Sequence, residues 1–146
     1  MKYYNEILDL GIFTRQDIQR IIKNSKTAES FLSRSLKKGY IKRIKQNYYV
    51  AIDIANNTPF CNKYVIATKL DKSNYISYHS ALEYRGLNNQ VFNEVVYSGH
   101  KRINDFEFEY VAYHFVQSKC DLQIETNYDG VKVTSIERTM IDCIDQ

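Results

Sequence analysis

Hydrogen-bond donors recur with helical spacing in one segment near the start of the chain. Four of them occupy positions i, i+3, i+4 and i+7 and so line one stripe of a predicted helix: Ser30, Ser33, Arg34 and Lys37. Lys26 and Thr27 stand at the beginning of the same segment. Arginine and lysine can donate to guanine O6 and N7 or to phosphate, and hydroxyl groups can reach bases or phosphate. The stripe is therefore typical of a helix face that binds DNA.

Further basic residues follow within a predicted β-hairpin. Its two β-forming runs are residues 40–44 and 48–51, and the three residues between them match the length of a hairpin connection. Asn47 can adopt the left-handed conformation that such a turn needs. We expect phosphate contacts from the basic side chains of this hairpin, which are Lys42, Arg43 and Lys45.

Three predicted helices must position these groups. The first ends at Gly11, and Thr14 caps the second. The third is capped by Thr27, runs to Lys38 and ends at Gly39. Three helices followed by a basic hairpin outline a winged helix-turn-helix, in which the third helix enters the major groove. The sequence predicts this DNA-binding domain over residues 1–52, with double-stranded DNA as its partner.

The distribution of charge favours the same interpretation. Residues 1–52 hold 11 Lys/Arg against 4 Asp/Glu, a net +7, whereas the remaining residues hold 9 against 13, a net −4. Such an asymmetry indicates that the first part meets a polyanion. Two alternatives stay open, because a basic face can simply be solvated and winged helices also serve as protein-interaction modules.

Residues 53–146 predict a small mixed domain, so the overall fold class is α+β. A polar linker over residues 53–58 leads to a helix that starts at Thr58-Pro59, and further helices cover residues 78–85 and 136–144. Strands are expected at residues 95–98, 106–115, 122–125 and 131–134. The last helix, capped by Ser135, carries an apolar stripe that we expect to pack on something.

Patterns that identify an enzyme are poorly represented. His79 and Ser80 are neighbours whose side chains would diverge on a helix, and no phosphate-binding glycine motif is present. The acidic residues Glu107 and Glu109 have no spacing that identifies a metal or acid–base site, and we expect Glu137, Arg138 and Asp142 to form an ion-pair network. The sequence therefore predicts no catalytic residues and no enzymatic activity.

Cofactors, metals and membranes are not predicted either. The three cysteines, Cys61, Cys120 and Cys143, are odd in number and widely spaced, so neither a disulfide framework nor a metal-binding pair is expected. The sequence shows no long apolar run that would span a membrane and no signal peptide. We therefore expect a cytoplasmic protein.

Three motifs, in this order and spacing, resemble the AbiEi family over nearly the whole chain. They are GYIKRI at residues 39–44 with YYVA at 48–51, YISYHSAL at 75–82 with Gly86-Leu87, and VTSIERTMID at 133–142. Members of this family are antitoxins of abortive-infection (AbiE-type, type IV) toxin–antitoxin systems and are also described as transcriptional regulators. The chain departs from the family in having Asn47 where a glycine is usual. The family also usually continues with further helices beyond the ERTMID segment at residues 137–142.

The resemblance implies an N-terminal winged helix that binds operator repeats and represses its own operon. Whether the chain forms a homo-oligomer on DNA stays open. It implies a C-terminal α+β domain that antagonises a nucleotidyltransferase-like toxin, and no enzymatic activity. One alternative is the N-terminal part of a longer winged-helix protein with a nuclease-like domain. A regulator of unrelated genes, without a toxin partner, is another.

Overall fold

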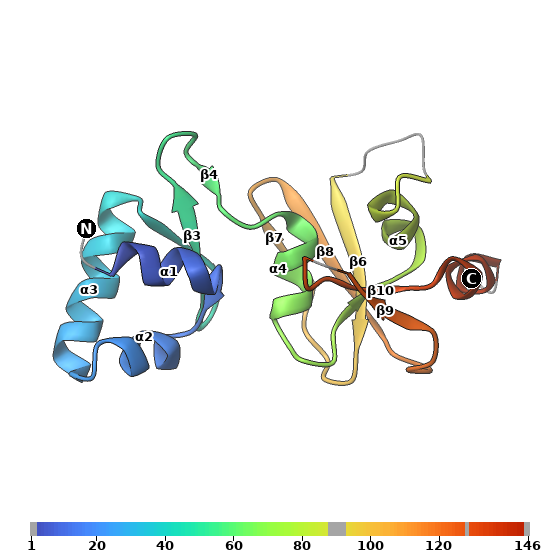
Figure 1. Cartoon of the computed structure of the whole chain (residues 1–146), viewed down its shortest axis with the longest axis horizontal. Helices are drawn as coiled ribbons and strands as arrows, with labels where there is room; N and C mark the ends of the chain where they lie inside the picture. The colour runs from blue at the N-terminus through green and yellow to red at the C-terminus, as the bar shows by residue number, and fades with distance from the viewer. Residues whose placement is uncertain (1–2, 88–92, 128, 145–146) are drawn as a thin grey trace. The chain divides into compact units, whose positions relative to one another are not determined.

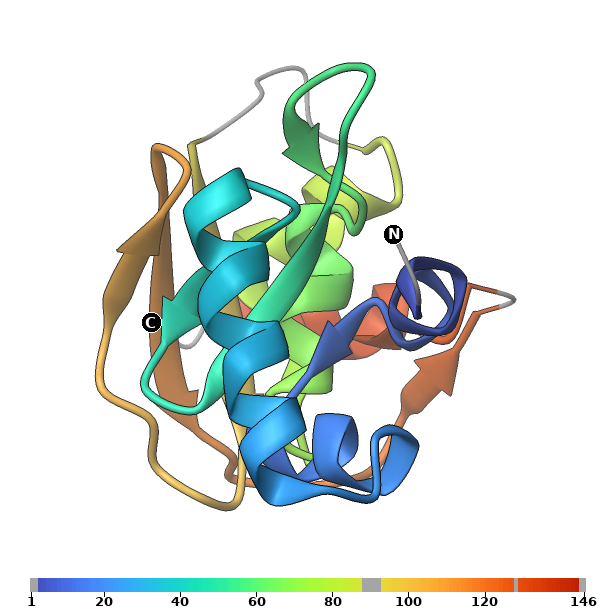
Figure 2. The same cartoon turned by 90° about the vertical axis from the view of Figure 1, so that its left-hand side faces the viewer.

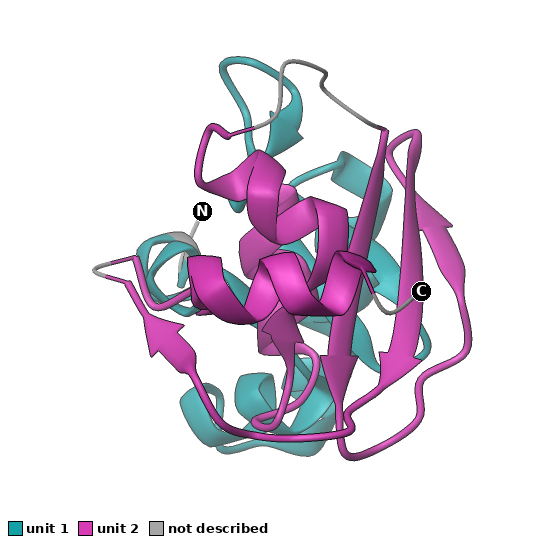
Figure 3. Cartoon of the chain, turned by 90° about the vertical axis from the view of Figure 1, so that its right-hand side faces the viewer, with its two compact units in different colours: residues 1–62 teal, residues 63–146 magenta. Residues whose placement is uncertain are grey.

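The chain folds into two compact units with a mixed α+β architecture. The structure is a computed structural model that describes residues 3–87, 93–127 and 129–144. Unit 1 comprises residues 1–62 and unit 2 residues 63–146 (Figures 1 and 3). The described residues form six helices and two β-sheets. The predicted α+β class is confirmed.

Unit 1 combines three helices with a small antiparallel sheet. Its elements are α1 (Tyr4–Leu10), β1 (Ile12–Phe13), α2 (Arg15–Ile21), α3 (Ser25–Lys38), β2 (Ile41–Lys45), β3 (Tyr48–Asp53) and β4 (Thr58–Pro59). The strands follow the order β1–β3–β2, and β4 pairs with β3. Figure 2 shows α3 along the front of the unit with strands of this sheet behind it. The longest helix of the unit therefore has one side on the sheet.

Local hydrogen bonds explain where α2 and α3 begin. Thr14 and Asp17 form a reciprocal capping box at the start of α2, as expected for Thr14. The cap of α3 is Asn24, whose Oδ1 accepts from the Thr27 backbone N at 3.1 Å. The prediction that Thr27 caps this helix is wrong, because Asn24 keeps an extended backbone and the helix starts before Thr27. Gly39 ends α3 in the left-handed region, with φ 79°, as predicted.

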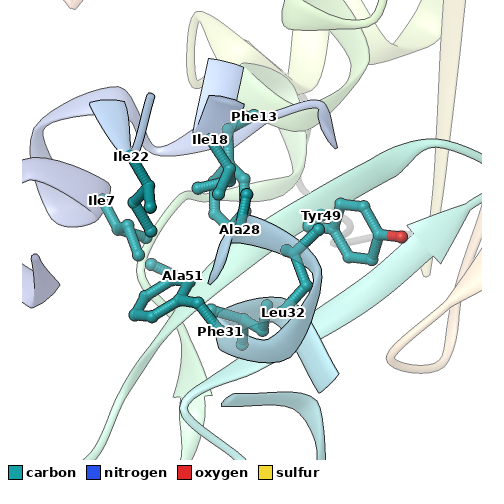
Figure 4. Packing of buried hydrophobic residues seen from close by; sticks show 10 residues of the cluster. Ile7, Phe13, Ile18, Ile22, Ala28, Phe31, Leu32, Tyr49 and Ala51 are labelled. Carbon is teal, nitrogen blue, oxygen red and sulfur yellow. The ribbon is translucent and has the colours of Figure 1, made fainter. Parts of the chain in front are cut away.

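A hydrophobic core holds the three helices of unit 1 on its sheet (Figure 4). Ile7 of α1, Ile18 of α2 and Phe31 of α3 are all buried in it. Phe13 of β1 stacks on Tyr49 of β3 with ring centroids 5.9 Å apart. Burying one such side chain contributes about 1.5–3 kcal/mol. This core fixes which side of each helix faces outward.

The segment after β3 differs from the prediction of a linker followed by a helix. The Asp53 carboxylate accepts from Ala55 N and from Asn56 Nδ2, which forms a turn. The chain then returns as β4, and Phe60 N donates to Ala51 O at 2.9 Å. The predicted helix start at Thr58-Pro59 is wrong, since proline is also tolerated in a short edge strand. Unit 1 thus extends past the expected boundary at Ile52.

Unit 2 contains a six-stranded mixed sheet and three helices. Its elements are α4 (Lys63–Lys69), β5 (Tyr75–Ile76), α5 (Tyr78–Tyr84), β6 (Glu94–Gly99), β7 (Phe106–Phe108), β8 (Val111–Gln117), β9 (Ile124–Thr126), β10 (Lys132–Thr134) and α6 (Ile136–Ile144). The strand order is β7–β8–β6–β5–β10–β9, with β6 parallel to β8 and β5 parallel to β10. In Figure 1, α4 and α5 lie on opposite sides of β6, and Figure 3 shows α5 and α6 on the side that faces the viewer.

The predicted single strand over residues 106–115 is a hairpin of β7 and β8. Glu109 and Tyr110 both have positive φ, 51° and 66°, as the central residues of a type I′ turn do. The rings of Phe106 and Tyr113 then stack across the two strands with centroids 4.6 Å apart. The prediction is wrong because the turn contains neither glycine nor asparagine, so the alternation of apolar residues continues through it.

The cap of α3 leads to a direct stability test. Replacing Asn24 by Ala leaves the Thr27 backbone N without its cap, so we expect the free energy of unfolding of unit 1 to fall by about 1 kcal/mol. Thr27→Ala is the matched control, because the Thr27 side chain is exposed and makes no cap of its own. Urea unfolding followed by circular dichroism measures both. Equal destabilisation by the two variants would contradict the assignment of the cap.

Candidate nucleic-acid interface

The two sides of α3 differ in chemistry as the spacing predicts. Its buried residues are Ala28, Phe31, Leu32 and Ser35. Four hydrogen-bond donors lie exposed on its outer side, which are Ser30, Ser33, Arg34 and Lys37. Leu36, at the border between the two sides, is 38% exposed. Because packing holds the inner side, the outer side chains are presented outward without being needed for the core.

The first turn of α3 extends this exposed surface. Lys26 and Thr27 are exposed. Together with Arg34 and the intervening polar residues they line a shallow, open depression along the helix. Arg34 Nε donates to the Ser30 backbone O at 3.4 Å, so the guanidinium group lies along the helix. The depression is thus lined mainly by donors, with the Glu29 carboxylate among them, and can accommodate a flat or convex surface.

The basic residues of the β2–β3 hairpin divide between its two faces. Successive residues of a strand point to opposite sides, so Lys42 and Arg43 lie on different faces. Arg43 is exposed, whereas Lys42 and Lys45 are half-buried. The register shifts between Arg43 and Lys45, at a β-bulge or irregularity, so the simple alternation of sides does not extend to Lys45. The sequence predicted these three residues as one group, and the structure separates them.

Asn47 ties the tip of the hairpin to the start of α2. Its backbone has φ 68°, the left-handed conformation expected for this turn. Its Oδ1 accepts from Arg15 N at 3.4 Å, and its Nδ2 donates to Gln16 Oε1 at 3.3 Å. The side chain is therefore engaged within unit 1, which positions the hairpin beside α2.

Two charged residues that the sequence analysis left out complete this surface. Arg15, the first residue of α2, places its Nη1 atom 3.0 Å from Glu29 Oε1 on α3. Both side chains are exposed, 49% for Arg15 and 60% for Glu29. Glu29 is three residues after Lys26 and four before Ser33, so the helical spacing already placed it on the outer face. Its negative charge distinguishes it from the neighbouring donors.

Unit 2 contains a row of alternating carboxylates and imidazoles. Both carboxylate oxygens of Glu94 on β6 lie close to an imidazole, with Oε1 2.7 Å from His79 Nε2 and Oε2 3.3 Å from His114 Nε2. The other ring nitrogen of His114, Nδ1, lies 3.0 Å from Asp105 Oδ2. An imidazole donates from both nitrogens only when it is protonated. The geometry therefore favours the imidazolium form of His114.

The pKa shifts agree with this geometry. The hydrogen bond that His114 donates to Asp105 raises the pKa of His114, with the charges of Asp105 and Glu94 acting in the same direction against desolvation. The same hydrogen bond lowers the pKa of Asp105. Among the residues that the structure describes, no group of three or more histidine, cysteine or acidic side chains could hold a metal ion. The row is thus an ion-pair chain between secondary-structure elements.

The remaining polar candidates of unit 2 have structural partners. Ser80 is buried and its Oγ accepts from Val96 N at 2.7 Å, so it faces away from the ion pair of His79. Arg138 donates to Leu122 O and Tyr75 OH and pairs with Asp142 at 3.3 Å. Glu137 is exposed, and within the described residues the expected network contains only Arg138 and Asp142 as an ion pair. Cys120 and Cys143 of unit 2, and Cys61 of unit 1, are not joined by disulfide bonds.

Comparisons with known proteins assign no family and no function to this chain. No family model matches the chain, and no curated protein matches it significantly. No helix in the described part of the chain is both long and apolar enough to cross a membrane.

The ion-pair chain of unit 2 predicts a pH dependence with a definite sign. A raised pKa of His114 means that its stabilising contribution is complete below about 6.5, the pKa of a free imidazole, and is lost as the pH rises through the folded-state pKa. We expect the pKa of His114, measured by NMR titration of the ring protons, to fall in Asp105→Asn. Glu107→Gln removes a nearby exposed charge as the control. An equal effect of both variants, or a His114 pKa below that of free imidazole, would refute the assignment.

Proposed function

We propose that unit 1 is a winged helix-turn-helix domain that binds double-stranded DNA, with α3 in the major groove and the β2–β3 hairpin against the backbone. The observation that carries this proposal is the exposed face of α3, which presents donors over three helical turns while the opposite face is buried. Arg34 is proposed to contact a base edge, and Lys26, Thr27, Ser30, Ser33 and Lys37 to contact bases or phosphates.

The topology of unit 1 supports this proposal. Three residues, 22–24, separate α2 from α3, which is the length of turn found in helix-turn-helix motifs. The hairpin that follows α3 belongs to the sheet β1–β3–β2, and its exposed Arg43 is available to a phosphate. Lys42, Lys45 and Asn47 complete the proposed contacts of the hairpin.

Size and charge also fit a duplex. The 14 residues of α3 correspond to a length of about 21 Å, and a helix with its side chains has a diameter of about 10–12 Å. The major groove of B-DNA is about 12 Å wide and admits such a helix. Unit 1 carries eleven Lys/Arg against five Asp/Glu, a net +6, whereas unit 2 carries nine against twelve, a net −3. The attraction to phosphate is therefore concentrated in unit 1.

We further propose that the chain is a cytoplasmic transcriptional regulator and the autorepressing antitoxin of an abortive-infection operon, without enzymatic activity of its own. The motifs that resemble the AbiEi family support this part. Unit 2 would then antagonise a nucleotidyltransferase-like toxin. Its α6 leaves Ile136, Met140 and Ile141 between 42% and 58% exposed, and an exposed apolar stripe of this kind is typical of protein contacts.

Charge variants of the full chain test DNA binding. Lys26, Arg34 and Lys37 are replaced together by Gln, and an exposed set of equal charge in unit 2, Lys69, Lys101 and Lys119, is replaced as the control. Affinity for a mixed-sequence duplex is measured over a range of salt concentrations. We expect the α3 variant to bind more weakly and its salt slope to become shallower by about 0.9 for each phosphate no longer neutralised.

The control set should leave both the affinity and the salt slope close to those of the unmodified chain. Equal loss in the two variants would show that total charge, and not the α3 face, determines binding. Absence of binding by the unmodified chain at low salt would refute the proposed function. Circular dichroism and thermal unfolding of each variant show whether the fold is intact.

A further inference from the structure

Glu29 carries a negative charge on the surface that is proposed to bind a polyanion. It is the only carboxylate in α3, and its exposed side chain lines the same depression as Lys26, Ser30 and Arg34. A carboxylate facing phosphate is repelled, by about 0.7 kcal/mol for unit charges 6 Å apart in water. If α3 contacted only the phosphates of the DNA backbone, Glu29 would weaken the binding of DNA.

A contribution to the stability of the fold does not explain why a glutamate occupies position 29. Its ion pair with Arg15 is exposed on both sides, and exposed pairs of this kind contribute little to stability. The pair does restrict where the carboxylate lies. Arg15 is held in turn, because its backbone N donates to Asn47 Oδ1 at the hairpin tip. Glu29 is thus positioned by a residue of α2 that the hairpin keeps in place.

The major groove offers few partners to a carboxylate. An ionised carboxylate only accepts hydrogen bonds, and guanine presents two acceptors, N7 and O6, at this edge. Adenine presents its N6 donor beside the N7 acceptor, and thymine presents an acceptor and a methyl group. Cytosine alone presents an amino donor, N4, without a neighbouring acceptor on the same base.

We infer that Glu29 is a specificity-determining residue that accepts a hydrogen bond from cytosine N4 and disfavours the other bases at that position. Arg15 is its positioning residue. The inference rests on the proposed function, because it requires α3 to lie in the major groove. It adds a residue that selects sequence partly by repulsion, alongside the donors that attract the duplex.

Selection from a randomised duplex library tests this role. The full chain, its Glu29→Gln variant and a matched Glu6→Gln variant are each used to enrich bound DNA, which is then sequenced. Glu6 is exposed on α1 and loses the same charge. We expect the unmodified chain to enrich a motif containing a C·G pair that the Glu29→Gln variant changes to A·T, because glutamine pairs bidentately with adenine N6 and N7.

The Glu29→Gln variant should also bind random DNA about threefold more tightly, through loss of the repulsion. The Glu6→Gln variant should enrich the original motif. An enriched motif that Glu29→Gln leaves unchanged at every position would refute the role of Glu29 while leaving DNA binding by unit 1 intact. Failure of the unmodified chain to retain any duplex would overturn both the proposed function and this inference. Thermal unfolding confirms that each variant is folded.

Discussion

Burial of Ala28, Phe31 and Leu32 in the core of unit 1 fixes the rotation of α3 about its own axis. Successive helical residues are about 100° apart, so this single constraint also decides which side chains face outward. A cavity in this core would loosen the orientation of the outer face as well as the fold. The proposed recognition surface is therefore a consequence of packing on the opposite side of the same helix.

The surface around α3 is organised by polar contacts that link separate elements. Asn47 joins the hairpin tip to α2, and Arg15 joins α2 to Glu29 on α3. Each contact is weak by itself because it is exposed. Together they set where the hairpin and the charged groups lie relative to α3. In the proposed complex, arginine and lysine supply attraction, and Glu29 supplies discrimination.

Helices with a strong apolar period were predictable from the sequence, and reversals without turn residues were not. The period of α3 and the glycine that ends it identified the helix, but Asn24 and Thr27 are both good caps, so only the backbone conformation decided between them. The turn at Glu109 and Tyr110 lacks the usual residues, so the pattern read as one strand. Pro59 could equally begin a helix or lie in an edge strand.

The exposed donors of the candidate site could be predicted for the same reason as α3 itself, since helical spacing alone assigns Ser30, Ser33, Arg34 and Lys37 to one side. The ion pair of Arg15 with Glu29 could not, because it joins residues 14 apart through the packing of two helices. The hairpin could be predicted from the sequence only in part. Its basic residues were evident, but the bulge and the half-buried positions of Lys42 and Lys45 depend on tertiary structure.

The most direct test of DNA binding by the exposed face of α3 is an NMR titration of the ¹⁵N-labelled full chain with a short mixed-sequence duplex at low salt. The account predicts that the largest amide shift changes fall on α3 and the β2–β3 hairpin, that they diminish as salt is added, and that the sheet of unit 2 is unaffected. Changes centred on unit 2, or on the buried side of α3 without its exposed side, would contradict the central claim. So would a spectrum that excess duplex leaves unchanged.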